Sequence, residues 1–96
     1  MAFAVAARWV ARAGEEEQVL RCIDALTQAS RAEDGCRFYQ ANRDLDDPKV
    51  FFLYEIYDDG AAADAHWASE HFREHALEDA IPRLDTRERW FYQTLD

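Results

Sequence analysis

All three histidines of the chain, His66, His71 and His75, lie within one ten-residue stretch. His71 and His75 are four positions apart, so on a helix their rings share one face. Two imidazoles in this arrangement can bind a metal ion, and His66 and Glu55 are the residues that could join them. The remaining spacing matches no standard metal site, and such a pair on an acidic surface is more often solvated. We therefore expect no metal site.

Glu55 is the one charged residue in the apolar run VFFLYEIY. In a strand it shares a face with Phe51, Leu53 and Tyr57. A carboxylate buried there must be paired or hydrogen-bonded, or its pKa rises. Two interpretations stay open at this point: a structural salt bridge or hydrogen bond to a helix, or an acid or base in a pocket beside His66.

The common fingerprints of cofactor sites are absent. The only glycines are Gly14, Gly35 and Gly60, all at expected turns, so there is no phosphate-binding glycine loop. Neither a Gly-x-Ser-x-Gly nor a His-Glu-x-x-His motif occurs. Cys22 and Cys36 form no CxxC or Cys/His spacing. We expect no cofactor and two buried thiols in a reducing cytosol, with a disulfide or a catalytic thiol as the alternatives.

The charge balance excludes two classes of partner. A net charge of −9 and an isoelectric point near 4.6 argue against nucleic acid and against an anionic membrane surface. The apolar stretch at the N-terminus is interrupted by Arg8 and Arg12. It is too short to span a membrane and lacks the order of a signal peptide. We expect a cytoplasmic protein.

Six elements, one of them a helix split into two halves, must position these residues in what we expect to be a single domain over residues 2–95. Alternating apolar residues predict strands, and apolar residues at helical spacing predict helices. Pro48 marks a turn between the second and third strands. Ser69 is expected to start the second half of a split helix as its N-cap. The predicted strands are 2–11, 36–43, 50–57 and 86–95, and the predicted helices are 15–32, 61–68 and 69–80.

This order predicts an α+β fold of the ferredoxin-like βαββαβ type, an antiparallel four-stranded sheet with helices on one face. The third strand is apolar on both faces, with Val50, Phe52, Tyr54 and Ile56 opposite the face of Glu55. A strand of this kind is covered on both sides. The helices supply one cover. We expect a second copy of the chain to supply the other, giving a homodimeric α+β barrel.

Residues 35–75 carry motifs in an order that resembles the antibiotic biosynthesis monooxygenase family. Members typically have Gly-Cys before a strand that bears a Tyr, an Asp-Pro turn, and a strand with Tyr-Glu-x-aromatic. An Ala-His pair, a Ser or Thr, and a His-Phe pair follow. Here these are Gly35-Cys36, Tyr39, Asp47-Pro48, Tyr54-Glu55-Ile56-Tyr57, Ala65-His66, Ser69 and His71-Phe72.

The resemblance implies a dimeric barrel with a pocket between sheet and helices in each protomer. Several relatives oxidise quinols or aromatic polyketides with O2 and without metal or flavin, which needs a base and a dry aromatic pocket. The expectation is therefore a cofactor-independent monooxygenase with a small aromatic substrate. His66 is expected to act as base or orienting group, with Glu55 setting its tautomer. The residues expected to bind the substrate are Tyr39, Tyr57, Trp67, His71 and Phe72.

Two other functions remain as alternatives, because family and fold do not fix the reaction. One is an isomerase of a small oxygenated metabolite, of the autoinducer-processing type, which would use His66 and Glu55 for proton transfer. The other is a ligand-binding dimer without enzymatic activity. Haem-degrading members of the family carry an Asn on the first strand and a Trp on the split helix. The first strand here has no Asn, and His66 occupies the position of that Trp, with Trp67 one place later. These differences argue against haem degradation.

Overall fold

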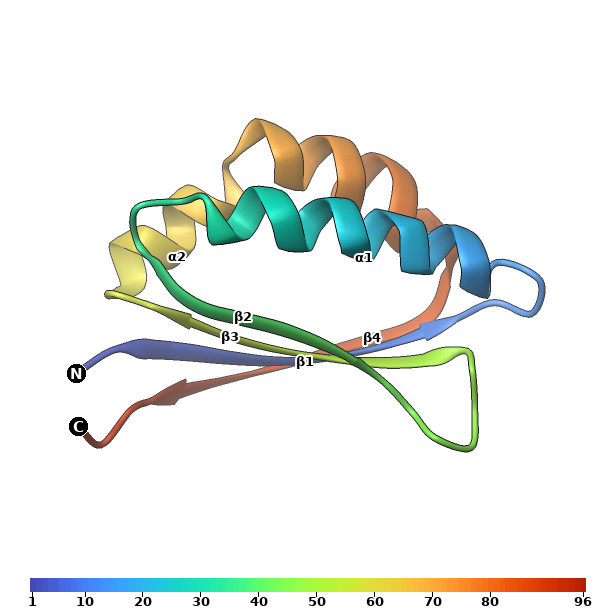
Figure 1. The fold of residues 1–96 in the computed structure, drawn as a ribbon, viewed down its shortest axis with the longest axis horizontal. Helices are drawn as coiled ribbons and strands as arrows, with labels where there is room; N and C mark the ends of the chain where they lie inside the picture. The colour runs from blue at the N-terminus through green and yellow to red at the C-terminus, as the bar shows by residue number, and fades with distance from the viewer.

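The computed structural model describes residues 1–96 as one four-stranded sheet with a helical layer on one face (Figure 1). All pairings are antiparallel and the strand order is β2-β3-β1-β4. The α+β, ferredoxin-like prediction is confirmed. The elements are β1 (Phe3–Ala11), α1 (Glu16–Arg31), β2 (Cys36–Arg43), β3 (Val50–Tyr57), α2 (Gly60–Trp67), the π-helix η1 (Phe72–Ala80), the 3-10 turn η2 (Ile81–Arg83) and β4 (Leu84–Gln93).

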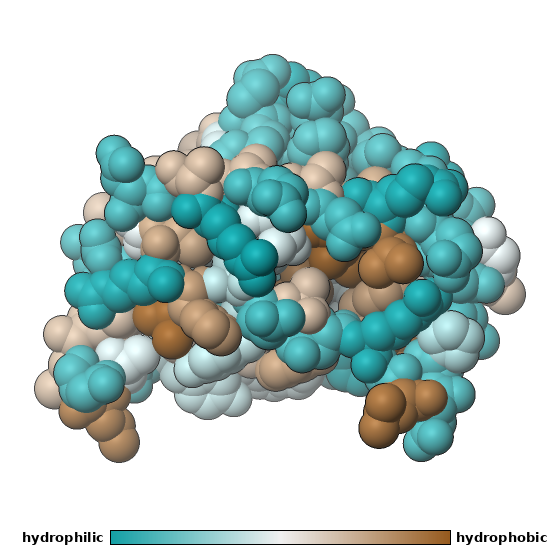
Figure 2. Space-filling view, in the orientation of Figure 1, coloured by the Kyte–Doolittle hydropathy of each residue, from teal (hydrophilic) through white to brown (hydrophobic).

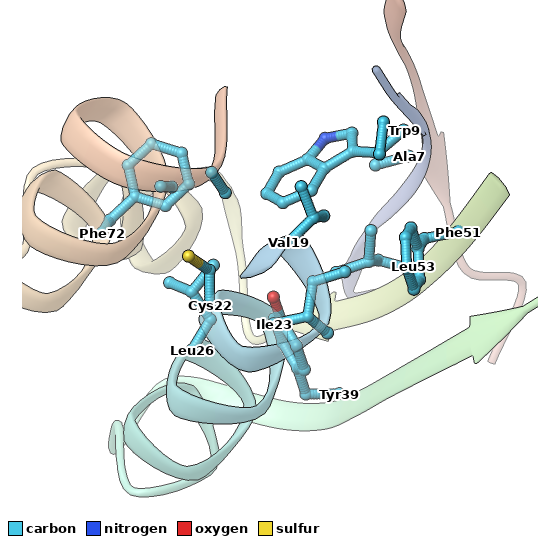
Figure 3. Packing of buried hydrophobic residues seen from close by; sticks show 13 residues of the cluster. Ala7, Trp9, Val19, Cys22, Ile23, Leu26, Tyr39, Phe51, Leu53 and Phe72 are labelled. Carbon is cyan, nitrogen blue, oxygen red and sulfur yellow. The ribbon is translucent and has the colours of Figure 1, made fainter. Parts of the chain in front are cut away.

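Helix α1 forms where its sequence favours a helix at both ends and along one side. Glu16 and Glu17 occupy the first turn and Arg31 the last, so each charge opposes the nearer end of the helix dipole. Its buried residues recur three or four positions apart and face the sheet, as Figure 3 shows for Val19, Ile23 and Leu26. The side chain of Arg31 then ties the helix to β2 by donating to the carbonyl of Tyr39 at 2.8 Å.

The core lies between this helical layer and the covered face of the sheet (Figure 3). Phe51 and Leu53 of β3 are almost fully buried beneath α1, each with 1% of its surface exposed. Burying a side chain of this size contributes about 1.5–3 kcal/mol. The 13 residues of the main cluster are Ala7, Trp9, Ala11, Val19, Cys22, Ile23, Leu26, Tyr39, Phe51, Leu53, Phe72, Ala76 and Ala80.

The second helical segment is split, as predicted, but its two halves differ in type. Ser69 lies between them, and its Oγ accepts a hydrogen bond from the Phe72 N–H at 3.1 Å, which is the expected capping role. From Phe72 onward the helix is wound as a π-helix, a wider form found often near functional sites. None of the helices in the fold is long and apolar enough to cross a membrane.

Strand β4 begins and ends two residues earlier than the sequence pattern indicates. Its pairing with β1 starts at Leu84, opposite Ala11, after a register shift between Val10 and Ala11. Backbone pairing therefore recruits Leu84 and Asp85, whose side chains give no strand signal. The strand lies at the edge of the sheet, and every residue after Leu84 in it is exposed.

The second face of the sheet has no cover within the chain. Large apolar side chains remain there with 41–56% of their surface exposed, among them Phe52, Trp90 and Tyr92. By contrast, hydrophilic side chains gather over the outside of the helical layer (Figure 2). Strand β3 is apolar on both faces, but the chain buries only the face toward the helices.

Gly35 allows the turn after α1 to lie directly against α2. A Cβ atom at this position would stand 2.6 Å from the Cβ of Ala62. Gly35→Ala is therefore expected to lower the free energy of unfolding by about 1–3 kcal/mol, the usual cost of overpacking. Urea unfolding followed by circular dichroism measures the change.

The matched control is Gly60→Ala, where an added Cβ would meet only Phe3, at 4.0 Å. Gly60 is the first residue of α2, so alanine there is expected to leave stability unchanged or to raise it slightly. Equal losses in the two variants would contradict the close packing of Gly35 on α2.

Candidate functional site

His66 lies at the centre of the molecule, on the last turn of α2, with 2% of its surface exposed. Helix α2 is held in place by Asp59, whose side chain accepts a hydrogen bond from the Ala62 N–H at 2.9 Å. Aromatic rings surround the imidazole, with ring centroids 5.1 Å away for Tyr57 and 5.2 Å for Phe72. Burial lowers the pKa of His66, against the opposing effect of a nearby carboxylate, Glu33.

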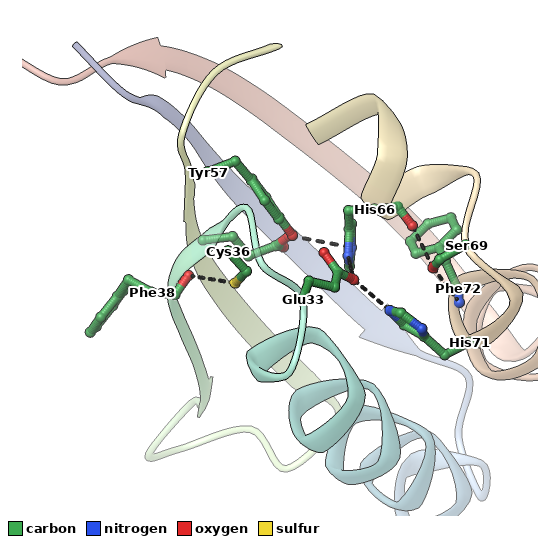
Figure 4. Close-up of polar contacts among 9 residues, drawn as sticks. Glu33, Cys36, Phe38, Tyr57, His66, Ser69, His71 and Phe72 are labelled. Carbon is green, nitrogen blue, oxygen red and sulfur yellow. Dashed lines mark hydrogen bonds and ion pairs between the residues drawn. The ribbon is translucent and has the colours of Figure 1, made fainter. Parts of the chain in front are cut away.

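Glu33 joins the two histidines that flank the helix break (Figure 4). One carboxylate oxygen, Oε2, lies 2.8 Å from Nδ1 of His66 and 2.5 Å from Nε2 of His71. A carboxylate only accepts hydrogen bonds, so both ring nitrogens must donate. This leaves Nε2 of His66 without the proton in the neutral ring and therefore able to accept one.

The histidines meet at Glu33 because of the break in the helix. Ser69 holds the break closed: its Oγ donates to the His66 carbonyl at 2.7 Å while accepting from Phe72. The chain turns between the two halves, which brings residues five apart to one carboxylate. His75, the expected helical partner of His71, is not part of this group.

Glu55 faces the other nitrogen of His66. Its Oε1 is 3.7 Å from Nε2 of His66, beyond a hydrogen bond, and accepts a hydrogen bond from the Tyr57 hydroxyl at 2.6 Å. Burial raises the pKa of Glu55 to about 7, although the hydrogen bond from Tyr57 acts in the opposite direction. Burial also raises the pKa of Tyr57, so this hydroxyl keeps its proton and donates a hydrogen bond to the Glu55 carboxylate.

His66 and Glu55 open onto a small cavity between sheet and helices. Its volume is about 20 Å³, enough for one water molecule. The indole N–H of Trp9, on the cavity wall, is buried and has no hydrogen-bond partner in the chain. The lining residues are Val5, Ala7, Trp9, Leu26, Tyr39, Glu55, His66, Trp67, Phe72, Arg87 and Arg89.

The structure brings most of the residues expected at the site together. Tyr39, Trp67 and Phe72 line the cavity along with Glu55 and His66. Tyr57 and His71 lie behind them. Tyr57 is linked to the cavity through Glu55, and His71 is linked to it through Glu33 and then His66.

Four residues of the site escaped the sequence analysis: Glu33, Trp9, Arg87 and Arg89. Glu33 lies just before Gly35-Cys36, outside the motif on which the resemblance was based, and a glutamate in a loop carries no signal of its own. The register that aligns Arg87 with Trp9 depends on the β1–β4 pairing, which sequence alone does not give. The bond that fixes the His66 tautomer comes from Glu33 rather than from Glu55.

The cysteines lie outside this site as free thiols. Cys22 is buried as expected, and burial raises its pKa to about 11. Cys36 is only half-buried, which differs from the expectation of two buried thiols, because it opens β2 at the edge of the sheet. Burial raises its pKa as well, so neither thiol is set up as a nucleophile.

A donor set for a metal ion exists at Glu33, His66 and His71. One ligand atom from each lies within 4.8 Å of the other two. Two imidazoles and a carboxylate suit a first-row divalent ion such as Zn²⁺. The same three atoms already satisfy one another by hydrogen bonds, so an ion would have to displace both shared protons.

The family model described as "Antibiotic biosynthesis monooxygenase" matches residues 2–76, most of the chain and all of the site except β4. The chain belongs to this family.

Individual proteins and solved structures that resemble this chain support the same assignment. The chain is 35% identical over 69 residues to "Putative monooxygenase Rv0793" of Mycobacterium tuberculosis, covering 72% of this chain and 67% of that protein. The solved structure of Rv0793 superposes with a TM-score of 0.90 and 28% identity, covering 100% and 97% of the two chains. The structure of PA3566 from Pseudomonas aeruginosa gives 0.92 and 28%, covering 99% and 95%.

The raised pKa of Glu55 predicts that this residue contributes to the pH dependence of stability. A carboxyl group whose pKa is higher in the folded than in the unfolded protein stabilises the folded protein. This stabilisation is complete at pH values below the pKa in the unfolded protein and is lost as the pH rises through the pKa in the folded protein. Folding raises the pKa of Glu55 from 4.5 to about 7. This shift corresponds to a loss of about 3 kcal/mol in the free energy of unfolding as the pH rises from below 4.5 to about 8. Urea unfolding between those pH values is expected to show that the unmodified protein loses this stability relative to Glu55→Gln, which keeps the opposing contribution of the lowered His66 pKa.

The control for this measurement is Glu74→Gln, which removes an exposed carboxylate from η1. Its profile is expected to follow the unmodified protein. If Glu55→Gln also followed the unmodified protein, the burial of an ionisable Glu55 would be contradicted.

Proposed function

We propose that the protein is a cofactor-independent monooxygenase that oxidises a quinol-like or polyketide-like aromatic molecule with O2. The observation that carries the proposal is the environment of His66. Its Nδ1 is held by Glu33, and its Nε2 faces an aromatic cavity beside Glu55. A buried base with a fixed tautomer is the main requirement for removing a proton from a hydroxyl of the substrate.

The chemistry asks little else of the protein. A hydroquinone that loses a proton to Nε2 of His66 becomes an electron-rich anion, which reduces O2. One hydroquinone plus one O2 gives one hydroxyquinone plus one water, so the substrate supplies all the electrons. Glu33 would stabilise the imidazolium that forms, and Glu55, whose pKa is about 7, would return a proton to the departing oxygen.

The substrate must enlarge the cavity, because two fused rings need far more than 20 Å³. On one side of the cavity Trp67 packs against Phe91, with ring centroids 5.7 Å apart. Beyond this contact, a surface hollow of about 400 Å³ is lined by Phe3, Gly60 and Phe91. Rotation of the Trp67 indole would connect the two spaces.

The decisive experiment is oxygen uptake with 1,4-naphthoquinol, together with the fate of ¹⁸O2. We expect one ¹⁸O atom in the hydroxyquinone product. His66→Ala is expected to lower kcat/KM about a hundredfold or more, since it removes the base. Glu33→Gln is expected to lower it less, because the base stays but loses its charged partner.

His75→Ala is the matched control, because it removes a histidine of η1 that takes no part in the site, and it is expected to keep full activity. Quinols also react slowly with O2 alone, giving hydrogen peroxide, so catalase and an enzyme-free blank are included. If uptake is the same in His66→Ala and in the unmodified protein, or if no ¹⁸O enters the product, the proposal is wrong.

The small cavity favours a second candidate, a ligand-binding dimer without enzymatic activity. An interior that admits one water molecule is what a filled, non-catalytic core would have. The two candidates differ in the labelling experiment, because only the monooxygenase transfers an atom of O2 to its substrate.

We propose further that the protein acts as a homodimer through the uncovered face of the sheet. The support is the apolar character of that face, where Phe38, Phe52 and Trp90 expose 45%, 42% and 41% of their surfaces. Contiguous apolar surface of this kind usually marks an interface. Face-to-face pairing would complete the barrel that the family resemblance implies.

Phe52→Glu tests this pairing, because it puts a charge in the middle of the uncovered face. Sedimentation equilibrium is expected to show a species of twice the 11.2 kDa chain mass for the unmodified protein and a shift to monomer in the variant. Leu45→Glu, at a fully exposed residue of the β2–β3 turn, is expected to stay dimeric. A monomeric unmodified protein would contradict the dimer.

A further inference from the structure

Two arginines line the His66 cavity from the edge strand β4. Arg87 pairs with Trp9 and Arg89 with Ala7 of β1, so both side chains lie on the helix-covered face of the sheet. Because β4 is at the edge and exposed along most of its length, the guanidinium groups stand where the cavity meets solvent. They form its cationic rim.

Neither guanidinium has a carboxylate partner, although the chain holds 20 acidic residues against 11 Lys and Arg. Arg89 lies instead over the rings of Trp67 and Phe91, 5.4 Å from each centroid. Arg12, Arg21 and Arg31 also lack an acidic partner, but each donates a hydrogen bond to an oxygen of the chain. Arg87 and Arg89 are the two arginines whose guanidinium groups form neither an ion pair nor a hydrogen bond, in a chain of net charge −9. The arginines that do form ion pairs with Asp or Glu are Arg8, Arg37, Arg43, Arg73 and Arg83.

The positive charge at the rim is not neutralised from inside the cavity. Burial lowers the pKa of Arg87, and repulsion from Arg89 lowers it further, while Glu55 acts in the opposite direction. Glu55 remains too far away for an ion pair, and its own raised pKa weakens its charge near neutral pH. An anion placed between the arginines would remove their mutual repulsion and gain charge-assisted hydrogen bonds.

We propose that the ligand of this pocket is an aromatic molecule that carries a carboxylate, held by Arg87 and Arg89 at the rim. Its ring would lie against Trp67 and Phe72 with the reactive hydroxyl toward His66. A carboxylate fits better than a bulkier anion because the guanidinium fork matches it in one plane and the cavity is narrow. This inference rests on the proposed function for the location of the ligand and adds the class of substrate.

The test compares two ligands of equal shape, 1-hydroxy-2-naphthoate and 1-hydroxy-2-naphthamide, by isothermal titration calorimetry under nitrogen. Neither is a hydroquinone, so binding is measured apart from oxidation. We expect the carboxylate to bind the unmodified protein at least about tenfold more tightly than the amide. In the double variant Arg87→Gln/Arg89→Gln the ratio is expected to fall to about one.

Two further proteins separate charge from structure. The double variant Arg87→Lys/Arg89→Lys keeps both charges and is expected to retain part of the preference. Arg21→Gln, which removes an exposed arginine of α1 that also lacks an acidic partner, is expected to keep all of it. Circular dichroism confirms that each variant is folded.

The inference is overturned if the two ligands bind equally, if neither binds at millimolar concentration, or if the preference survives in the double Gln variant. Its failure is distinct from that of the proposed function. Oxygen uptake with the neutral quinol but no charge preference would leave the monooxygenase and remove this inference. A preference for the carboxylate ligand without oxygen uptake would retain this inference and contradict the monooxygenase.

Discussion

The two hydrogen bonds that Glu33 accepts organise the centre of this protein. They join the loop after α1 to both sides of the break between α2 and η1. A buried imidazole without a partner is costly, so His66 is stable in its aromatic surroundings only while Glu33 receives its N–H. Gly35 supports this arrangement, because only a residue without a side chain lets this loop approach α2 so closely. The position of the His66 ring therefore depends on a loop as well as on the regular elements around it.

Burial acts in opposite directions on the two groups at the cavity. It lowers the pKa of His66 and raises the pKa of Glu55, so near neutral pH both tend toward their uncharged forms. A proton acceptor and a proton donor that lie 3.7 Å apart, each shifted toward its uncharged form, are suited to proton transfer at the cavity. Glu33 lies against the side of His66 that faces away from the cavity, where it opposes the effect of burial on the His66 pKa.

Sequence patterns could predict the framework and part of the site. The alternation in Val50–Tyr57 fixes which face each residue of β3 occupies, and with it the burial of Glu55 beside the helices. The shared helical face of His71 and His75 could not indicate that His71 meets His66, because a continuous helix would not bring residues five apart to one carboxylate. The chain turns at Ser69, and His66 and His71 therefore both reach Glu33. No local pattern indicates Glu33, whose role arises only when distant segments meet.

The alternation of side chains along β4 separates two roles within one strand. Arg87, Arg89 and Phe91 lie on the side of the cavity, since they align with Trp9, Ala7 and Val5.

The alternate residues of β4, which include Trp90 and Tyr92, point to the uncovered face of the sheet. Pairing of two chains through that face would bury the second set and leave the first set free to meet a ligand. Under the proposed dimer and the proposed ligand, the two exposed sides of this edge strand would each have a partner. The arginines and the aromatic residues of β4 can then be changed separately, because in a strand each substitution alters only one face of the sheet.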